Sequence, residues 1–354
     1  MKKILISGYY GAGNFGDELI LSLLLDKLKD CKVTVLSHNP RKTYEMYGVH
    51  TVSAFSFDHV LKEIISCDVL ISGGGSLLQN VTSSASLFFY SSIIKLAKAC
   101  RKEVVIFAQG IGPIKGWYSP GMVKKLLRKA DFVSVRDEKS MELMNKWKVK
   151  QAKLVCDPAY SLEVSQPERT KTIGIQLRKF NNITDELFDN IVNQVKLRYF
   201  DREIELLCLQ DDMDRGVSQI FINKLKQVDP KINVKLVCGL KQQDIIDHIS
   251  KYDCLIGMRY HACLLAVKYG VKTLAVGYDP KVEMLAKDEG IPCLSMVSKK
   301  NDYDKAFDTM ENLSRWNLME NSKVRKFSWD DTGIYEIKKE KRKKDKNDKN
   351  KKKK

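Results

Sequence analysis

The sequence predicts an α/β protein with two Rossmann-like domains that face each other across a cleft. Apolar, β-branched runs alternate with helix-period stretches through the first half of the chain. A polar, proline-containing segment then interrupts them, and the alternation restarts. Strands that alternate with helices in this way are typical of βα units in a parallel sheet. The length of 354 residues also suits two domains of ordinary size.

The first α/β set predicts an N-terminal domain over residues 1–165. Its expected strands are 2–8, 32–37, 68–73, 104–110, 132–137 and 152–157, and its expected helices are 17–30, 91–102, 121–130 and 139–147. The second set predicts a C-terminal domain over residues 170–330, with strands 172–177, 203–209, 233–238, 253–258 and 272–278 and a helix over 242–252. Ligands of such folds bind at the carboxyl ends of the parallel strands.

A lysine-rich tail follows at residues 338–354. Its 12 Lys/Arg against 3 Asp/Glu give +9, which leaves +8 for residues 1–337 of the total +17. The tail has no apolar residue, so we expect it to be disordered. It is either a solvated tail or a segment attracted to an anionic membrane. Because it has no aromatic residues for base stacking, we expect no nucleic-acid partner.

The remaining composition indicates a cytoplasmic protein. No apolar run approaches the length of a membrane helix, and "MKKILISGYY" is interpreted as a first strand rather than a signal peptide. The nine cysteines form no C-x-x-C pair and suit a reducing compartment. No Asp/Glu/His cluster has metal-ligand spacing, so we expect no metal.

Glycine-rich turns follow three expected strands, in "GYYGAGNFGDELI", "ISGGGSLLQN" and "AQGIGP". Glycines let backbone N–H groups approach an anion at a helix N-terminus. The first turn matches neither the dinucleotide fingerprint nor the P-loop. In the second, Ser76 either approaches a substrate oxygen or caps a helix. Together the three turns predict one rim lined by backbone.

A basic set stands at other expected strand ends. Taken singly, such an arginine is usually a surface residue and such a histidine a core residue. Together they suit phosphate and carboxylate groups, which guanidinium groups bind through two hydrogen bonds. The set comprises Arg136, Arg178, Arg259, Lys281 and His261.

These motifs resemble the polysaccharide pyruvyl transferase family, specifically its CsaB-type members of bacterial cell-wall assembly. The resemblance covers almost all of residues 1–300 and depends on seven motifs in order: "GYYGAGNFGDELIL", "SGGGSLLQNVTS", "AQGIGP", "SVRDEKS", "DPAY", "GMRYHACLLA" and "GYDPKVEMLAKDEGIP". Asn80 departs from the family pattern, which usually has Asp after "SLLQ", and the lysine tail lies outside that pattern.

The resemblance implies a GT-B-like fold and phosphoenolpyruvate as pyruvyl donor, with no further cofactor. The implied acceptor is an N-acetylmannosamine residue of a lipid-linked secondary cell-wall polysaccharide. The product would be a 4,6-ketal that S-layer-homology domains recognise. The C-terminal domain would then hold phosphoenolpyruvate and the N-terminal domain the acceptor. The tail could keep the enzyme at the inner face of the cell membrane.

The site residues receive roles from this chemistry. Arg178, Arg259 and Lys281 are expected to bind phosphoenolpyruvate, with Arg136 as a fourth cation. His261 is the candidate general acid, or alternatively a phosphate ligand. Asp17 is either a base toward the acceptor hydroxyl or the helix N-cap. Acceptor binding is assigned to residues of the first two glycine turns: Gly13, Asn14, Gly74, Gly75 and Ser76.

Three other functions are weaker alternatives to this interpretation. A nucleotide-sugar glycosyltransferase of cell-surface polysaccharide synthesis would use the same fold. A dinucleotide-dependent oxidoreductase is disfavoured because its fingerprint is absent. A nucleic-acid binder would depend on the tail alone.

Overall fold

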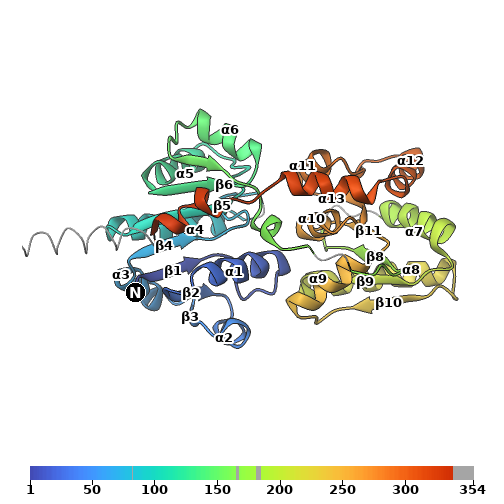
Figure 1. Ribbon diagram of the computed structural model, residues 1–354, viewed down its shortest axis with the longest axis horizontal. Coiled ribbons are helices and arrows are strands. Elements are labelled where there is room, and N and C mark those ends of the chain that lie inside the picture. The colour runs from blue at the N-terminus through green and yellow to red at the C-terminus, as the bar shows by residue number, and fades with distance from the viewer. Residues whose placement is uncertain (82, 165–166, 181–184, 338–354) are drawn as a thin grey trace, which may run out of the picture. The chain divides into compact units, whose positions relative to one another are not determined.

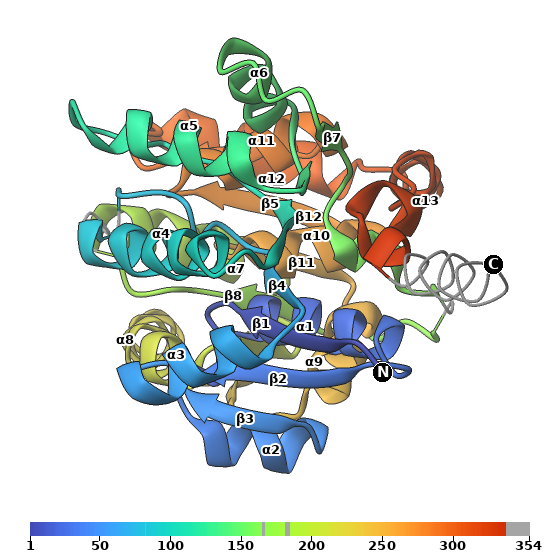
Figure 2. The same cartoon turned by 90° about the vertical axis from the view of Figure 1, so that its left-hand side faces the viewer.

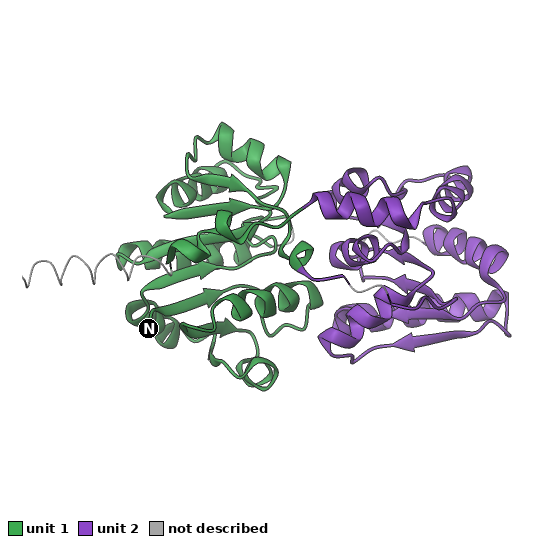
Figure 3. Cartoon of the chain, viewed as in Figure 1, with its two compact units in different colours: residues 1–161, 326–354 green, residues 162–325 purple. Residues whose placement is uncertain are grey.

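The computed structural model describes residues 1–81, 83–164, 167–180 and 185–337, and the chain forms two compact units (Figure 3). Of the described residues, unit 1 consists of Met1–Ser161 together with 326–337, and unit 2 is Leu162–Arg325. Each unit is a parallel sheet covered by helices, which confirms the predicted α/β class with two Rossmann-like domains. Their facing across a cleft stays a prediction. The tail 338–354 lies outside the described residues.

Unit 1 contains a seven-stranded parallel sheet in the order β3-β2-β1-β4-β5-β6-β7 (Figure 1). The order reverses between the neighbouring strands β1 and β4, and such a switch point is where open α/β sheets bind ligands. The strands are β1 (Lys3–Ser7), β2 (Lys32–Ser37), β3 (His50–Ser53), β4 (Val69–Ser72), β5 (Glu103–Gln109), β6 (Phe132–Val135) and β7 (Ala152–Leu154).

The strands of unit 1 alternate their side chains between two apolar layers. Leu5 packs in one core with residues of α3, α4, α5 and α6, whereas Ile4 and Ile6 pack in the other with α1. Figure 2 shows α3, α4 and α5 on one side of the strands. The helices are α1 (Phe15–Lys27), α2 (Pro40–Tyr47), α3 (Phe57–Ser66), α4 (Ser84–Ala99), α5 (Ser119–Lys129), α6 (Glu138–Lys146) and the 3-10 turn η1 (Pro158–Ser161).

Unit 2 repeats this topology with six parallel strands in the order β10-β9-β8-β11-β12-β13. The switch point lies between β8 and β11. The strands are β8 (Ile173–Gln176), β9 (Ile204–Leu207), β10 (Val234–Val237), β11 (Cys254–Gly257), β12 (Lys272–Gly277) and β13 (Cys293–Ser295). The helices are α7 (Asp185–Tyr199), α8 (Asp211–Val228), α9 (Gln242–Lys251), α10 (Tyr260–Lys268), α11 (Pro280–Glu289), α12 (Lys300–Glu311) and α13 (Arg315–Val324).

The C-terminal segment belongs to unit 1, which differs from the expected end of the second domain at residue 330. The aromatic side chains of this segment explain the difference. Trp329, in the 3-10 turn η2 (Trp329–Thr332), stacks on Phe107 of β5 with ring centroids 5.7 Å apart, and Phe327 meets the same ring edge-on. Ile334 and Ile337 are fully buried in the same core.

One pair of cysteines departs from the expected reduced state. Cys208 and Cys238, which directly follow the neighbouring strands β9 and β10, form a disulfide. Within the described residues, no helix combines the length and apolarity that crossing a membrane requires.

Candidate functional site

The predicted phosphoenolpyruvate residues of unit 2 lie at its switch point. Gln176 ends β8, and its side-chain oxygen accepts from the Arg259 backbone N–H at 2.7 Å. The Arg178 backbone N–H approaches the Met258 sulfur at 3.4 Å. Arg178 and Arg259, 81 residues apart in the chain, therefore leave the sheet from two adjacent central strands. The carboxyl ends of such strands form the usual ligand site of this topology.

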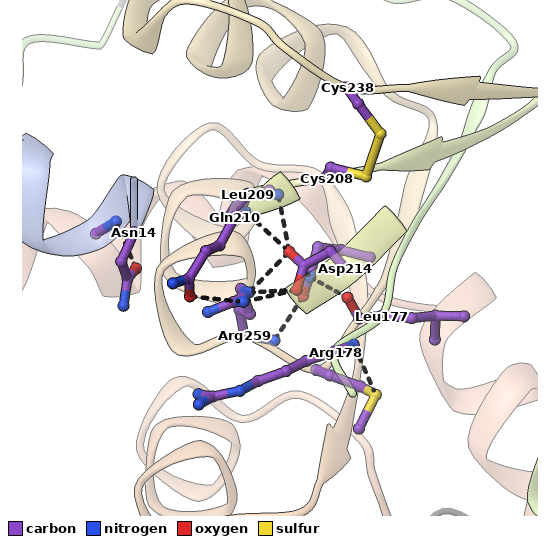
Figure 4. A network of polar contacts seen from close by, with 12 residues as sticks. Asn14, Leu177, Arg178, Cys208, Leu209, Gln210, Asp214, Cys238 and Arg259 are labelled. Carbon is purple, nitrogen blue, oxygen red and sulfur yellow. Dashed lines mark hydrogen bonds and ion pairs between the residues drawn. A yellow bond between two sulfur atoms is a disulfide. The ribbon is translucent and has the colours of Figure 1, made fainter. Parts of the chain in front are cut away.

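Arg259 is held firmly at the start of α10. It occupies the N-cap position and is only 5% exposed. Its Nε and Nη2 donate to the Asp214 carboxylate at 2.9 and 2.6 Å, and Nη2 also donates to Gln210 Oε1 at 3.1 Å (Figure 4). Among the described residues, these bonds use two of the three guanidinium nitrogens. The geometry orients a cation at a helix N-terminus, where the helix dipole also favours anions.

Asp214 is the residue on which this arrangement depends, and the sequence did not reveal it. Its carboxylate is fully buried in the first turn of α8, where it also accepts from the backbone N–H groups of Leu209 and Gln210 at 2.9 and 3.0 Å. Gln176 Nε2 adds a fourth donor at 3.3 Å. A buried carboxylate needs such partners. In the sequence, Asp214 is indistinguishable from its exposed neighbour Asp212, because only burial separates them.

Arg178 presents a different environment. Its Nη1 donates to the Tyr278 hydroxyl at 3.0 Å, and its guanidinium carbon lies 5.5 Å from the centroid of that ring. The Arg178 Nε atom is buried and has no hydrogen-bond partner among the described residues. A buried donor without a partner is costly, so this atom is suited to receive an anionic ligand.

Lys281 and His261 complete the basic set on two helices of the same sheet edge. Lys281 lies in the first turn of α11, and its Nζ is 3.5 Å from the carboxylate of the N-cap residue Asp279. His261 is half-buried in the first turn of α10, two residues after Arg259. The two helices contact each other. The edge therefore offers three cations and an imidazole to a ligand.

The acceptor residues of the first glycine turn lie at the switch point of unit 1. Here the structure corrects the expected N-cap. Asn14, not Asp17, caps α1, and its side chain accepts from the Gly16 N–H at 3.2 Å. Asp17 instead lies in the first turn, one residue before the buried Glu18. Gly13 precedes the cap with φ of +73°, a conformation that favours glycine.

The second glycine turn follows β4, directly beside the first. A side chain at Gly75 would place its Cβ 2.6 Å from Asp17 Oδ1, and Gly75 has φ of +96°. A Cβ at Gly74 would lie 2.7 Å from Ile20 Cγ2. The glycines thus let α1 and the Asp17 carboxylate pack against the turn. Close packing alone accounts for glycine at both positions.

Ser76 and Arg136 come together in unit 1. Arg136 Nη2 donates to Ser76 Oγ at 2.9 Å, and Nη1 pairs with the buried Asp157 at 3.3 Å. Ser76 therefore does not cap a helix, because α4 begins at Ser84 and is capped by Ser83. The set predicted from strand ends is split between the units. Arg136 lies in unit 1, whereas the other four members lie in unit 2.

Buried titratable side chains pack next to the glycine turn that follows β1. Burial raises the pKa of Glu18, against the opposing effect of hydrogen bonds from Gly11 and Tyr47. The Gly11 N–H donates to Glu18 Oε1 at 2.7 Å, and the Tyr47 hydroxyl donates to Oε2 at 3.1 Å. Burial, followed by the nearby Asp17 and Glu18 charges, raises the pKa of Tyr10 well above its usual range.

One group of potential metal ligands occurs among the described residues, at Cys208, Asp211 and Cys238, with ligand atoms within 4.8 Å of one another. Two of its three members are the disulfide-bonded cysteines. It lies outside the basic set, and it carries no role in the function proposed below.

Comparisons with solved structures show the same fold at low identity. The chain superimposes on the UDP-GlcNAc 2-epimerase of Methanocaldococcus jannaschii with a TM-score of 0.64 and 10% identity, covering 96% of this chain and 99% of that one. A putative UDP-N-acetylglucosamine 2-epimerase from Listeria monocytogenes gives 0.63 and 11%, covering 95% and 94%. Anabaena Alr3699/HepE in complex with UDP-glucose gives 0.64 and 11%, covering 95% and 99%. This likeness supports the GT-B-like architecture of the chain.

A search for relatives among curated proteins finds no match. The family model for polysaccharide pyruvyl transferases, in contrast, matches residues 14–280, about three quarters of the chain. The matched range contains Asn14, Asp17, Gly74, Gly75, Ser76, Arg136, Arg178, Arg259 and His261, whereas Gly13 and Lys281 lie just outside it. The chain belongs to the polysaccharide pyruvyl transferase family.

Proposed function

We propose that this chain transfers pyruvate from phosphoenolpyruvate to a sugar as a 4,6-ketal. The observation that carries the proposal is the pair Arg178 and Arg259 at the switch point of unit 2. Phosphoenolpyruvate has a carboxylate and a phosphate on a three-carbon frame, which suits several fixed cations at one sheet edge. The three cations are Arg178, Arg259 and Lys281, and we assign the donor to this edge.

The chemistry requires a proton on the methylene carbon of the donor, which becomes a methyl group. An acceptor hydroxyl then forms a bond to the carbon that bears the phosphate and loses its own proton. The bond to phosphate breaks, inorganic phosphate leaves, and a second hydroxyl of the same sugar closes the ketal. His261 is assigned the proton donor, or a hydrogen bond to the leaving phosphate. Fixed cations stabilise the charge on the departing group.

We assign the acceptor to the carboxyl edge of the unit 1 sheet. Asp17, against Gly75, is the candidate base for an acceptor hydroxyl. Gly13 and Asn14 follow β1, and Gly74 and Ser76 follow the neighbouring strand β4, at the same switch point. Arg136 is held between Ser76 and Asp157. The case for Arg136 as a fourth cation that binds phosphoenolpyruvate is therefore weaker than the case for Arg178, Arg259 and Lys281.

The acceptor we propose is β-N-acetylmannosamine in a lipid-linked precursor of a secondary cell-wall polysaccharide. Its acidic ketal would anchor S-layer-homology domains, and no cofactor beyond the donor is needed. This assignment rests on the CsaB-type motifs, and attraction of the lysine tail to the inner membrane face would fit it.

Phosphate release from phosphoenolpyruvate, with a synthetic lipid-linked N-acetylmannosaminyl-N-acetylglucosamine acceptor, tests the proposal. We expect acceptor-dependent release, a product that gains one ketal-linked pyruvate, and almost no turnover by His261→Ala. Release with other sugars only would keep the reaction and refute the acceptor. If UDP-N-acetylglucosamine stabilised the protein while phosphoenolpyruvate did not, the glycosyltransferase alternative would replace this proposal.

A further inference from the structure

Exposed hydrophobic side chains gather where three neighbouring helices of unit 1 begin. Helices α3, α4 and α5 each follow a parallel strand of one sheet, so their first residues share its carboxyl edge. The three helices lie together over one face of the sheet (Figure 2). Several large exposed apolar side chains at one sheet edge are typical of an interaction surface. The exposed fractions at this edge are Phe55 70%, Phe57 69%, Val81 55%, Phe88 45%, Trp117 94% and Tyr118 55%.

The loop that carries Trp117 is held in place. Asn80 Nδ2 donates to the Lys115 carbonyl at 2.8 Å, and Asn80 Oδ1 accepts from the Lys115 N–H at 2.7 Å. An aspartate at position 80 could make only the second of these bonds. Trp117 and Tyr118 lie edge to face, with centroids 5.8 Å apart. The departure of Asn80 from the family pattern thus fixes a loop with an indole that is almost fully exposed.

Helices α4 and α5, with the segments that flank them, carry the net positive charge of residues 1–337. Residues 81–102 and 110–130, which contain α4 and α5, hold nine Lys/Arg and no Asp/Glu. Residues 1–337 carry +8 in total, so everything outside these two segments sums to −1. Asp131 offsets Lys98 through an ion pair at 2.8 Å. The exposed cations are Lys95, Arg101, Lys115, Lys125, Arg128 and Lys129.

We infer that this face, defined by α4, α5 and the exposed apolar side chains near the starts of α3, α4 and α5, docks on an anionic phospholipid bilayer. Tryptophan and tyrosine prefer the membrane–water interface, and lysines nearby are attracted to anionic headgroups. Interfacial binding requires apolar and basic side chains together. Lys115 is two residues from Trp117, and Lys95 and Lys125 extend the positive charge along exposed positions of α4 and α5. The inference needs neither the lysine tail nor the proposed reaction.

Sedimentation of the full chain with vesicles of phosphatidylglycerol and phosphatidylcholine tests it. We expect Trp117→Ser to weaken binding about tenfold or more, since it removes a large exposed aromatic that the bilayer interface would bury. The double variant Lys125→Ser/Lys129→Ser should weaken binding about fivefold for each lysine removed. Matched controls lie in unit 2. Trp316→Ser, at a site 63% exposed, and Lys226→Ser/Lys251→Ser should bind like the wild type.

A second measurement separates lipid insertion from attraction by the tail. Brominated lipids should quench the fluorescence of the wild type and of Trp316→Phe, and the quenching should largely disappear in Trp117→Phe. Phosphate release with a water-soluble acceptor should be unchanged in Trp117→Ser, so failure of the docking face and failure of the proposed reaction give different results.

Three results would overturn the inference. The first is vesicle binding by Trp117→Ser equal to that of the wild type, with its thermal unfolding unchanged. The second is equally tight binding to an oligonucleotide that is also lost in Trp117→Ser, which would assign the face to nucleic acid. The third is a change from dimer to monomer in Trp117→Ser, which would make the face an interface between copies of this chain.

Discussion

Asp214 accepts from Arg259 through both carboxylate oxygens, with Nε–Oδ2 at 2.9 Å and Nη2–Oδ1 at 2.6 Å, in a fully buried position of α8. A two-point contact fixes the plane of the guanidinium as well as its position. The guanidinium of Arg259, which we assign to phosphoenolpyruvate binding, is therefore oriented by the Asp214 carboxylate, which takes no direct part in the reaction. Asp214 is a positioning residue for Arg259.

Replacing this carboxylate tests that relationship. We expect Asp214→Asn to lower kcat/KM for phosphoenolpyruvate about 10²-fold, because displacement of a binding group by an ångström has effects of that size. The variant should also lose about 3–5 kcal/mol of unfolding free energy, since a buried cation loses its partner. Steady-state phosphate release and urea unfolding measure the two effects.

Asp212→Asn, on the same helix turn but exposed, is the matched control and should change neither quantity. A purely structural role for Asp214 would lower stability and leave KM for phosphoenolpyruvate unaltered in the folded fraction.

Arg178 offers a second test, because its buried Nε has no partner among the described residues. Arg178→Lys keeps the charge and removes the planar group, and we expect affinity for phosphoenolpyruvate to fall about ten- to hundredfold. Tyr278→Phe removes only the hydroxyl that accepts from Arg178 Nη1, so a loss of about fivefold is expected. Calorimetric titration with phosphoenolpyruvate measures both. Equal affinities in all three proteins would separate Arg178 from the donor.

The sequence predicted the central strands of both sheets because these strands are buried on both faces and are continuous apolar runs. It missed β3, with the sequence His-Thr-Val-Ser, and the three-residue β13. Both are short strands at sheet edges, where one side lacks a strand and the apolar signal weakens. The sequence also predicted the end of the second domain at residue 330, whereas unit 2 ends at Arg325. Phe327 and Trp329 pack against unit 1, and no local periodicity in the sequence indicates such a tertiary contact.

The candidate site was predictable only where its residues stand at strand ends. Arg178 and Arg259 met that condition, and the structure places them on adjacent strands. Asp214 and Gln210 did not, because they lie in and before a helix whose acidic first turn resembles a solvated surface. Asp17 was one of two alternatives, a base or the N-cap, and Asn14 takes the cap because the helix begins two residues earlier than expected. Helix ends are the least certain part of a sequence pattern.

The contact between Asp17 and Gly75 predicts an unequal response of two glycines. Gly75→Ala would place a methyl group 2.6 Å from Asp17 Oδ1 on a backbone with φ of +96°, so we expect a loss of about 1–3 kcal/mol in unfolding free energy. Gly121→Ala, in α5 with nothing within 4 Å of the new Cβ, should be neutral or stabilise by up to about 1 kcal/mol. Urea unfolding measures both variants. Equal losses of unfolding free energy in Gly75→Ala and Gly121→Ala would contradict the packing of Asp17 against this turn.

Glu18 makes the stability of unit 1 depend on pH in a defined direction. Burial raises its pKa above the reference value of 4.5, so the folded chain binds this proton more readily than the unfolded chain. The group's contribution is therefore complete below about pH 4.5 and is lost as pH rises through the folded pKa. Each unit of such a shift corresponds to about 1.4 kcal/mol.

Glu18→Gln should remove this dependence. The difference in unfolding free energy, wild type minus variant, should increase as pH falls from 7 toward 4.5, as measured by urea unfolding at several pH values. Tyr47→Phe supplies a second check, because the Tyr47 hydroxyl donates to Glu18 Oε2 and opposes the rise in the Glu18 pKa. When both proteins also carry Tyr47→Phe, the increase in this difference with falling pH should begin at a higher pH. A difference that stays constant with pH, or grows as pH rises, would show that Glu18 is not held in the buried environment beneath Gly11.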